Sequence, residues 1–271
     1  MAQDPATAWW DVTWNPVRGC TRTSPGCDHC FAARYAERWR GVAGHPYERG
    51  FDVRPVADKL DLPLRWERSQ KVLVASMSDL FHEQLSDDYV ASALEVLRLA
   101  DWHHFFVLTK RPERMRRLWR RSFAKRPPEH VWLGVSVEDR KHGRPRIAKL
   151  RSIPAARRFV CFEPLLEDPG KLDLTGIDWV VLGGETGPGA RVLEHEWVIS
   201  VHRQCRAARI PFFFKQWGGP RHGASGRELD GRRHDRLPAL PKLRVPGRAT
   251  RRDRLYLVCD PFEDEVARPE G

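Results

Sequence analysis

The chain has 271 residues, of which 41% are hydrophobic and 31% are charged, and its formal net charge is +11. Eleven Trp and twelve Phe exclude a disordered chain, because so many large apolar side chains require a core. No apolar run approaches the roughly 18 residues of a membrane span, and the first residues lack the basic and apolar regions of a signal peptide. We therefore expect a cytoplasmic protein whose six cysteines are free, metal-bound or catalytic rather than paired in disulfides.

Short apolar runs alternate with helical patterns along most of the chain. The runs are rich in β-branched and aromatic residues and are nearly continuous, which favours strands buried on both faces of a parallel sheet. We predict strands over residues 10–14, 71–76, 104–109, 131–137, 158–162, 178–182 and 211–215. We predict helices over residues 29–40, 87–100, 112–124, 139–150 and 194–209.

This alternation predicts βα units with right-handed crossovers. Seven strands favour an α/β fold built as a partial TIM-like (βα) barrel of about six to seven parallel strands, which we assign to residues 1–218. No G-x-G-x-x-G follows the first strand, so a dinucleotide-binding fold loses support. Residues 219–271 are rich in Gly, Pro, Arg and Asp, and we expect them to form a basic, partly mobile C-terminal extension.

Three cysteines, Cys20, Cys27 and Cys30, lie in the segment CTRTSPGCDHC directly after the first predicted strand. Three thiolates with this C-x6-C-x2-C spacing can bind three irons of a 4Fe–4S cluster and leave the fourth iron open. The alternative is structural zinc, with His29 or a distant cysteine as the fourth ligand, and spacing alone does not separate the two. Position favours the cluster, because loops after barrel strands form the active sites of such folds.

The segments WNPVRGCTRTSPGCDHCFA, SMSDLFH, LTKRP, GVSVE, FEPLL, WVVLGGETGPGAR and PFFFKQWG occur in this order over residues 14–219. With them the chain resembles a phage-type three-cysteine-motif family of unknown function and, more distantly, the radical S-adenosylmethionine (SAM) superfamily, whose commonest spacing is C-x3-C-x2-C. The resemblance implies a 4Fe–4S cluster held by Cys20, Cys27 and Cys30. It also implies SAM as a second cofactor and an electron donor such as flavodoxin or ferredoxin.

Polar residues follow most of the predicted strands, and in a βα barrel these ends meet at one mouth. Carboxylates, lysines, serines and glycines suit the amino group, carboxylate, ribose and adenine of SAM. The candidate SAM-binding residues are Ser76, Ser78, Asp79, Lys110, Ser136, Glu138, Glu163, Gly183, Gly184 and Glu185. The GGE of 183–185 resembles the superfamily's amino-group-binding element but follows the sixth strand rather than the second. We therefore carry that role over to Ser78 and Asp79 more than to Glu185.

The implied chemistry is cleavage of SAM by the reduced cluster and hydrogen abstraction by a 5′-deoxyadenosyl radical. A repair-type reaction also needs a hydrogen-atom donor. Cys161 is the first candidate, because it shares a pleat face with Glu163 two residues on, and its alternative interpretation is a small core residue. Tyr35, Tyr47 and Tyr89 are alternative donors. Lys215, at the end of the seventh strand, is the second candidate catalytic residue. Cys205 and Cys259 are interpreted as structural.

Basic residues cluster in three segments, 110–126, 140–158 and 221–254, which carry nine, eight and eleven Lys or Arg residues against one, none and four acidic residues. Three such clusters favour a polyanionic partner, nucleic acid rather than a membrane, over solvated helix faces alone. Repair of a pyrimidine photolesion in DNA, as in spore photoproduct lyases, is the first hypothesis. Base or sugar modification of RNA is the second, and a zinc-bound, non-catalytic nucleic-acid-binding protein is the third.

Overall fold

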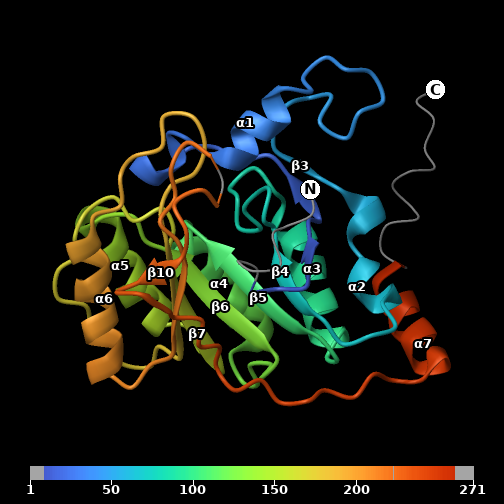
Figure 1. The fold of residues 1–271 in the computed structure, drawn as a ribbon. Coiled ribbons are helices and arrows are strands. Elements are labelled where there is room, and N and C mark those ends of the chain that lie inside the picture. The colour runs from blue at the N-terminus through green and yellow to red at the C-terminus, as the bar shows by residue number, and fades with distance from the viewer. Residues whose placement is uncertain (1–8, 222, 260–271) are drawn as a thin grey trace.

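The computed structural model describes residues 9–221 and 223–259 and is built around one curved, parallel, seven-stranded sheet (Figure 1). The strand order is β1-β4-β5-β6-β7-β8-β9, so successive large strands are neighbours in space. These strands are β1 (Val12–Trp14), β4 (Lys71–Val74), β5 (His104–Thr109), β6 (Val131–Ser136), β7 (Arg157–Phe162), β8 (Trp179–Gly183) and β9 (Phe212–Gln216). The predicted α/β half-barrel of seven parallel strands is confirmed.

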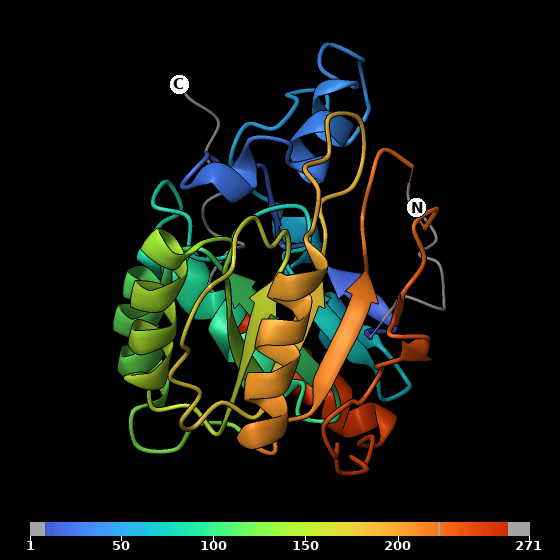
Figure 2. The same cartoon turned by 60° about the vertical axis from the view of Figure 1, so that its left-hand side comes forward.

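Helices cover one face of the sheet (Figure 2). They are α3 (Asp87–Leu99), α4 (Pro112–Phe123), α5 (Arg140–Arg151) and α6 (His195–Ala207). Two of them begin at capping side chains, since Ser86 accepts a bond from the Tyr89 N–H (3.2 Å) and Asp139 one from the His142 N–H (2.7 Å). The main hydrophobic core fills the space between these helices and the sheet.

The other face of the sheet carries a second, largely aromatic core. Its buried members are Trp9, Trp10, Leu73, Phe106, Trp132, Phe159, Cys161, Trp179, Val181 and Phe213. Trp9 meets Phe106 and Trp179 edge to face, with ring centroids 5.2 and 5.0 Å apart. Gly134 has no side chain because the Phe159 ring would lie 2.4 Å from its Cβ. Rings therefore fill the interior of the half-barrel beneath the carboxyl ends of its strands.

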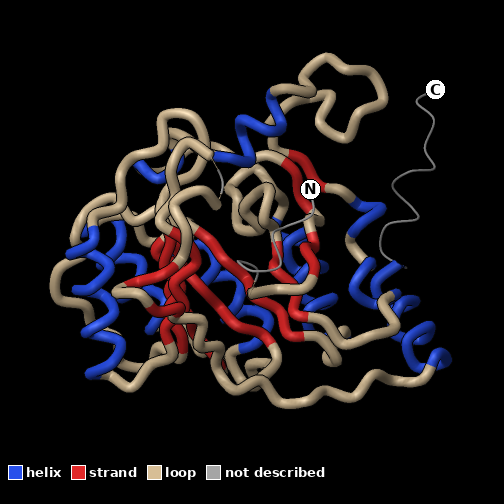
Figure 3. The backbone as a smooth tube through the Cα atoms, viewed as in Figure 1, coloured by secondary structure: helices blue, strands red, loops and turns tan. Residues whose placement is uncertain are grey.

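Between β1 and β4 the chain leaves the sheet and forms a segment of short elements and loops above it (Figure 3). The elements are β2 (Val17–Arg18), η1 (Pro25–Cys27), α1 (Phe31–Glu37), β3 (Arg54–Pro55), η2 (Ala57–Lys59) and α2 (Leu62–Arg65). The predicted helix over 29–40 is therefore shorter than expected. The antiparallel pairing of β2 with β3 was not predicted, because strands of two residues are too short to show the alternation of apolar and polar residues that indicates a strand.

Residues 223–259, which belong to the predicted C-terminal extension, contact the barrel. They form β10 (Glu228–Leu229), β11 (Arg232–Arg233) and α7 (Arg248–Cys259). Leu229 and Val258 are buried in the main core, and Arg254 donates to the Leu99 carbonyl oxygen at 2.6 Å. Residues 260–271 and the side chain of Cys259 lie outside the described part. Within residues 9–221 and 223–259, no helix combines the length and apolar character needed to cross a membrane.

Candidate active site

The cysteine loop (residues 19–30) is held over the carboxyl ends of the first strands. A parallel bridge joins Gly19 to Ser78, which follows β4. Gly19 has a φ of +76°, and a Cβ there would lie 2.2 Å from the carbonyl oxygen of Asp52, so the close approach of two backbones requires glycine. Cys30 is the N-cap residue of α1. The loop is thus fixed at both ends by backbone contacts.

The thiols of Cys20, Cys27 and Cys30 are free and partly buried. Tetrahedral zinc–thiolate sites hold sulfurs about 3.8 Å apart, because each Zn–S bond is about 2.3 Å long. Among the described residues, no three of these thiols and the His29 ring have donor atoms within 4.8 Å of one another.

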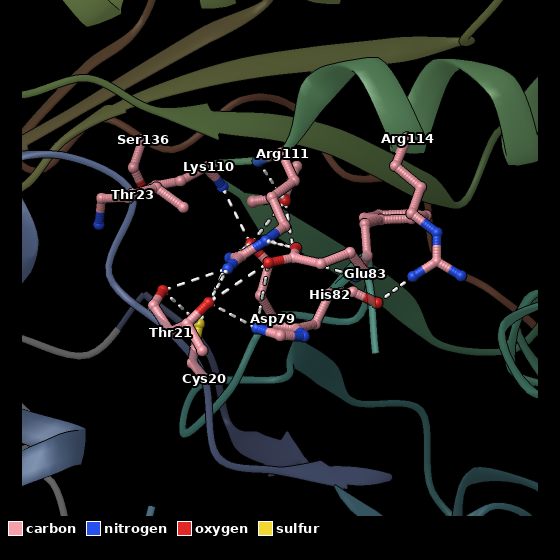
Figure 4. A network of polar contacts seen from close by, with 12 residues as sticks. Cys20, Thr21, Thr23, Asp79, His82, Glu83, Lys110, Arg111, Arg114 and Ser136 are labelled. Atoms are coloured by element: carbon pink, nitrogen blue, oxygen red, sulfur yellow. Dashed lines mark hydrogen bonds and ion pairs between the residues drawn. The ribbon is translucent and has the colours of Figure 1, made fainter. Parts of the chain in front are cut away.

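Arg111 joins the cysteine loop to the sheet (Figure 4). Its guanidinium donates to Cys20 Sγ at 3.4 Å and to the Thr21 carbonyl oxygen at 3.1 Å. It also forms ion pairs with Asp79 (3.2 Å) and Glu83 (2.6 Å). Burial disfavours the charged form of Arg111, but these carboxylates outweigh that effect and raise the pKa of the guanidinium above its usual value. The network therefore holds a permanent cation against the first cysteine.

The surrounding charges act differently on two of the thiols. Burial and the charge of Asp79 raise the pKa of Cys20 to about 11, against the lowering effect of Arg111. Burial also opposes ionisation of Cys27, yet Lys110 and local hydrogen bonds hold the pKa of Cys27 below its usual value. Free thiols beside a guanidinium and an ammonium fit the thiolate ligands of a metal cluster.

Five of the predicted residues end the inward-facing rows of five adjacent strands, and we call them the inner mouth. They are Lys110, Ser136, Glu163, Gly183 and Lys215. In each strand, the residue two or four positions earlier belongs to the aromatic core. Lys215 Nζ lies 2.6 Å from Glu163 Oε1 and 5.5 Å from the centre of the Trp10 ring. A Cβ at Gly183 would lie 3.4 Å from Lys215, so glycine leaves room beside this pair.

Cys161 lies one pleat below Glu163 and is buried in the aromatic core. Burial, and then the charge of Glu163, raise the pKa of its thiol well above the usual range, against the opposing effects of Lys215 and Lys110. Lys110 forms no ion pair with any described residue through its own ammonium group. The inner mouth thus combines a paired and an unpaired ammonium and lies above the buried thiol of Cys161.

Three other predicted residues are engaged by the protein itself. The Ser76 hydroxyl donates to the Asn15 side chain at 3.2 Å, and the Ser78 hydroxyl donates to a backbone carbonyl at 2.9 Å. Asp79 accepts from the Thr109 hydroxyl at 2.7 and 2.8 Å, on the opposite side of β5 from the inner mouth. The contacts of Asp79 make it a positioning residue for Arg111.

Glu138 lies beneath the cysteine loop rather than in the inner mouth. Its side chain is 1% exposed and pairs with Arg146 of α5 at 2.6 Å, while its Oε1 has no partner among the described residues. A Cβ at Gly26 would lie 3.2 Å from Glu138, and Arg146 also donates to Ser24 Oγ at 2.9 Å. The buried pair therefore joins α5 to the cysteine loop.

Glu185 ties the segment after β8 to the same loop. It accepts bonds from His29 at 3.0 Å and from the Arg191 guanidinium at 2.9 and 2.5 Å. Burial opposes ionisation, but the bonds from Arg191 and His29 lower the pKa of Glu185 to about 2. A Cβ at Gly184 would lie 1.9 Å from the Trp217 carbonyl oxygen, so this glycine is required by the neighbouring backbone.

Some arginines of the basic segments form ion pairs with acidic residues of the same chain. Arg114 and Arg117 of α4 both pair with Asp87 of α3. Arg151 of α5 pairs with Asp173. Part of the charge excess that favours a polyanionic partner therefore serves contacts within the fold.

Sequence reasoning did not select Arg111, Arg146 or Arg191, the three arginines that hold the cysteine loop. Arg111 could have been selected from the sequence, because it is the last residue of the Thr-Lys-Arg segment at the end of β5. The loop contacts of Arg146 and Arg191 span 122 and 166 residues of sequence, so no local pattern could reveal them. Their positions follow from the barrel topology.

No curated protein and no solved structure matches the chain. A family model described as a protein of unknown function, DUF5131, matches residues 5–238. The matched range includes the half-barrel, the cysteine loop and the β10–β11 pair, and it ends before α7. The chain therefore belongs to the DUF5131 family.

Proposed function

We propose that the chain is a radical SAM enzyme that carries a 4Fe–4S cluster and acts on nucleic acid. The observation that carries this proposal is the loop of three free cysteines above the polar carboxyl end of a parallel half-barrel. The position of the loop at the carboxyl ends of the strands, where barrel folds form their active sites, favours the cluster over the zinc-bound, non-catalytic alternative.

Cys20, Cys27 and Cys30 would hold the cluster. When bound, the reduced cluster with SAM supplies a 5′-deoxyadenosyl radical that removes a hydrogen atom from the substrate. A flavodoxin or a ferredoxin is the proposed electron donor. The role of Arg111 is to fix Cys20 and to offset thiolate charge, while Asp79 orients the guanidinium.

The inner mouth is the proposed binding site for SAM. Glu163 offers carboxylate oxygens to the amino group, and the unpaired ammonium of Lys110 offers a charge-assisted bond to the carboxylate. Lys215 orients Glu163 through their 2.6 Å contact. Cys161 keeps its proton because burial raises the pKa of its thiol, so it can return a hydrogen atom to a substrate radical.

An aromatic ladder beside the cysteine loop supports a substrate with exposed bases. Its members are Phe31, Tyr35, Trp39, His45 and Tyr47. Phe31 follows Cys30 directly, is 49% exposed and stacks on Tyr35 with ring centroids 6.3 Å apart. Arg18 lies 5.7 Å from the centre of the Tyr47 ring. Aromatic rings flanked by guanidinium groups bind unstacked bases and their phosphates.

The first proposed substrate is DNA with a pyrimidine photolesion, as in spore photoproduct lyases. A damaged base unstacks at lower cost than an intact one, which suits an enzyme whose radical is generated inside a barrel. Modification of an RNA base or sugar is the second candidate, because the aromatic ladder would stack either kind of strand.

The test is anaerobic reconstitution of the full chain with iron and sulfide, followed by SAM and one nucleic acid at a time. We expect a 4Fe–4S spectrum in the wild type and in Cys205→Ser, which changes a buried thiol of α6, but not in Cys27→Ala. Ultraviolet-irradiated DNA should stimulate formation of 5′-deoxyadenosine more than intact DNA or tRNA. Stoichiometric zinc without iron would overturn the enzyme proposal, and stimulation by tRNA alone would overturn the DNA assignment.

A further inference from the structure

A surface pocket of about 400 Å³ lies at the amino end of the sheet, opposite to the cysteine loop. It lies where α6 ends and β9 begins. Ligand sites in proteins commonly have volumes of about 300–1,000 Å³, so the pocket is large enough for a small molecule. Nothing in the proposed radical chemistry uses this pocket.

The two walls of the pocket come from parts of the chain that are far apart in sequence. One wall is the end of α6 and the turn after it, which carry Arg206 and Arg209. The other wall is the segment 232–236, which carries Arg233 and Arg236. This segment is held along β9, because the Phe214 N–H donates to the backbone of the segment at 2.6 Å. The arginines are thus presented by a fixed backbone.

The charges of the pocket are unbalanced. None of its four guanidinium groups forms an ion pair or hydrogen bond with another described residue. The acidic residue in the lining, Asp235, pairs with Arg227 at 3.9 Å. Arg206 lies in the last turn of α6 and Arg209 follows its C-cap, so both complement the helix dipole, whereas Arg233 and Arg236 have no such reason to lie there. An anion with several oxygens could accept charge-assisted hydrogen bonds from both walls, and guanidinium groups bind phosphate in this way.

Flat rings lie beside the arginines. His202 packs against Phe212 and His234, with ring centroids 4.9 and 4.5 Å apart, and all three rings line the pocket. Burial lowers the pKa of His202, as do the charges of His234 and Arg206, so its ring is neutral near pH 7. Flat rings beside guanidinium groups give the pocket a surface for a nucleobase next to one for its phosphate.

We propose that this pocket binds a phosphate-bearing nucleotide, with the phosphate between the arginines of the two walls and the base against the rings. The nucleotide is either free or the terminal residue of a single strand. The proposal stands on the pocket alone and does not depend on the cluster or on SAM.

The test is isothermal titration of the full chain, without reconstitution, with AMP, adenosine and a 5′-phosphorylated single-stranded oligonucleotide. The probe variant is Arg206→Glu/Arg233→Glu, which changes one arginine on each wall. The matched control is Arg120→Glu/Arg121→Glu, which makes the same change of charge on exposed residues at the end of α4. Far-ultraviolet circular dichroism and the thermal midpoint show whether each variant is folded, and Arg206→Lys/Arg233→Lys serves as a milder probe.

We expect wild type and control to bind AMP alike, and the probe variant to bind it about tenfold or more weakly, since each lost contact is a charge-assisted hydrogen bond. Adenosine should bind more weakly than AMP, because it lacks the phosphate. Competition between AMP and the strand identifies a terminal nucleotide as the ligand, and binding of AMP without competition identifies a free one. Equal AMP affinity in probe and control variants, or no AMP binding to the wild type at millimolar concentration, would overturn the proposal.

Discussion

Replacement of Arg146 by Met is expected to destabilise the fold strongly. The side chains of Arg146 and Glu138 are 7% and 1% exposed, and the pair is the one charged contact that the structure gives to the Glu138 carboxylate within the described residues. Removing one partner of a buried ion pair costs about 3–5 kcal/mol, because the other charge stays buried without compensation. An exposed pair contributes at most about 1 kcal/mol.

The free energy of unfolding should be measured by urea denaturation followed by Trp fluorescence. Arg98→Met is the matched control, because Arg98 pairs with Glu95 on the surface of α3, where the two side chains are 51% and 40% exposed. We expect a loss of about 3–5 kcal/mol for Arg146→Met and less than about 1 kcal/mol for the control. The double variant Glu138→Gln/Arg146→Met should regain much of the loss, because it removes the unpaired charge.

Equal losses in Arg146→Met and Arg98→Met would refute the reasoning. That result would mean that water reaches the Glu138 carboxylate in the folded protein. A loss that Glu138→Gln does not relieve would instead assign the effect to packing of the Arg146 side chain and to its bond with Ser24.

Three further predictions concern burial. Iodoacetamide should leave Cys161 unlabelled in the folded protein while it labels Cys30, and peptide mapping that finds equal labelling contradicts the burial of Cys161. Gly134→Ala should lower the free energy of unfolding by about 1–3 kcal/mol through overpacking, whereas Gly247→Ala, which meets nothing within 4 Å, should change it little; equal effects in urea denaturation would refute the contact. Burial lowers the pKa of His103 to about 4, so the unfolded state binds its proton first and stability falls as pH drops from about 6.5 towards 4. Between pH 7.5 and 5 the free energy of unfolding should fall by about 2 kcal/mol from this cause. His103→Gln should remove that part of the pH dependence, and an unchanged pH dependence in the variant would contradict the burial of the ring.

The main sheet and its helices were predictable because their signals are local. Near-continuous apolar runs indicate strands buried on both faces, and capping residues such as Ser86 and Asp139 mark where helices begin. The segment between β1 and β4 was not predictable in the same way. Its elements are short, and long-range bonds fix them, such as the one from the Trp14 indole to the Lys59 carbonyl oxygen at 2.7 Å.

The sequence predicted which polar residues end the strands at the candidate site, but not towards which face of the sheet each side chain points. Lys110 and Arg111 are neighbours in sequence, yet only Lys110 continues the inward-facing row of β5, while Arg111 reaches the cysteine loop and Asp79. Collecting polar residues at strand ends therefore mixes the two faces of the sheet. Counting every second residue from the aromatic core residues to the end of each strand would have distinguished Lys110, Ser136 and Glu163, which face inward, from the polar residues that face the helices.

The net charge of +11 was the weakest guide to a partner, because composition does not show which cations are already paired. The dense segment 110–126 contains Arg114 and Arg117, whose charges are met by Asp87. The pocket at the end of α6 includes Arg206 and Arg209, which lie outside all three basic segments. Counterions leave the nucleic acid in proportion to the phosphates that the protein neutralises, and an arginine already paired with a carboxylate neutralises a phosphate less completely. The salt dependence of nucleic-acid binding should therefore follow the unpaired arginines and not the density of basic residues along the chain.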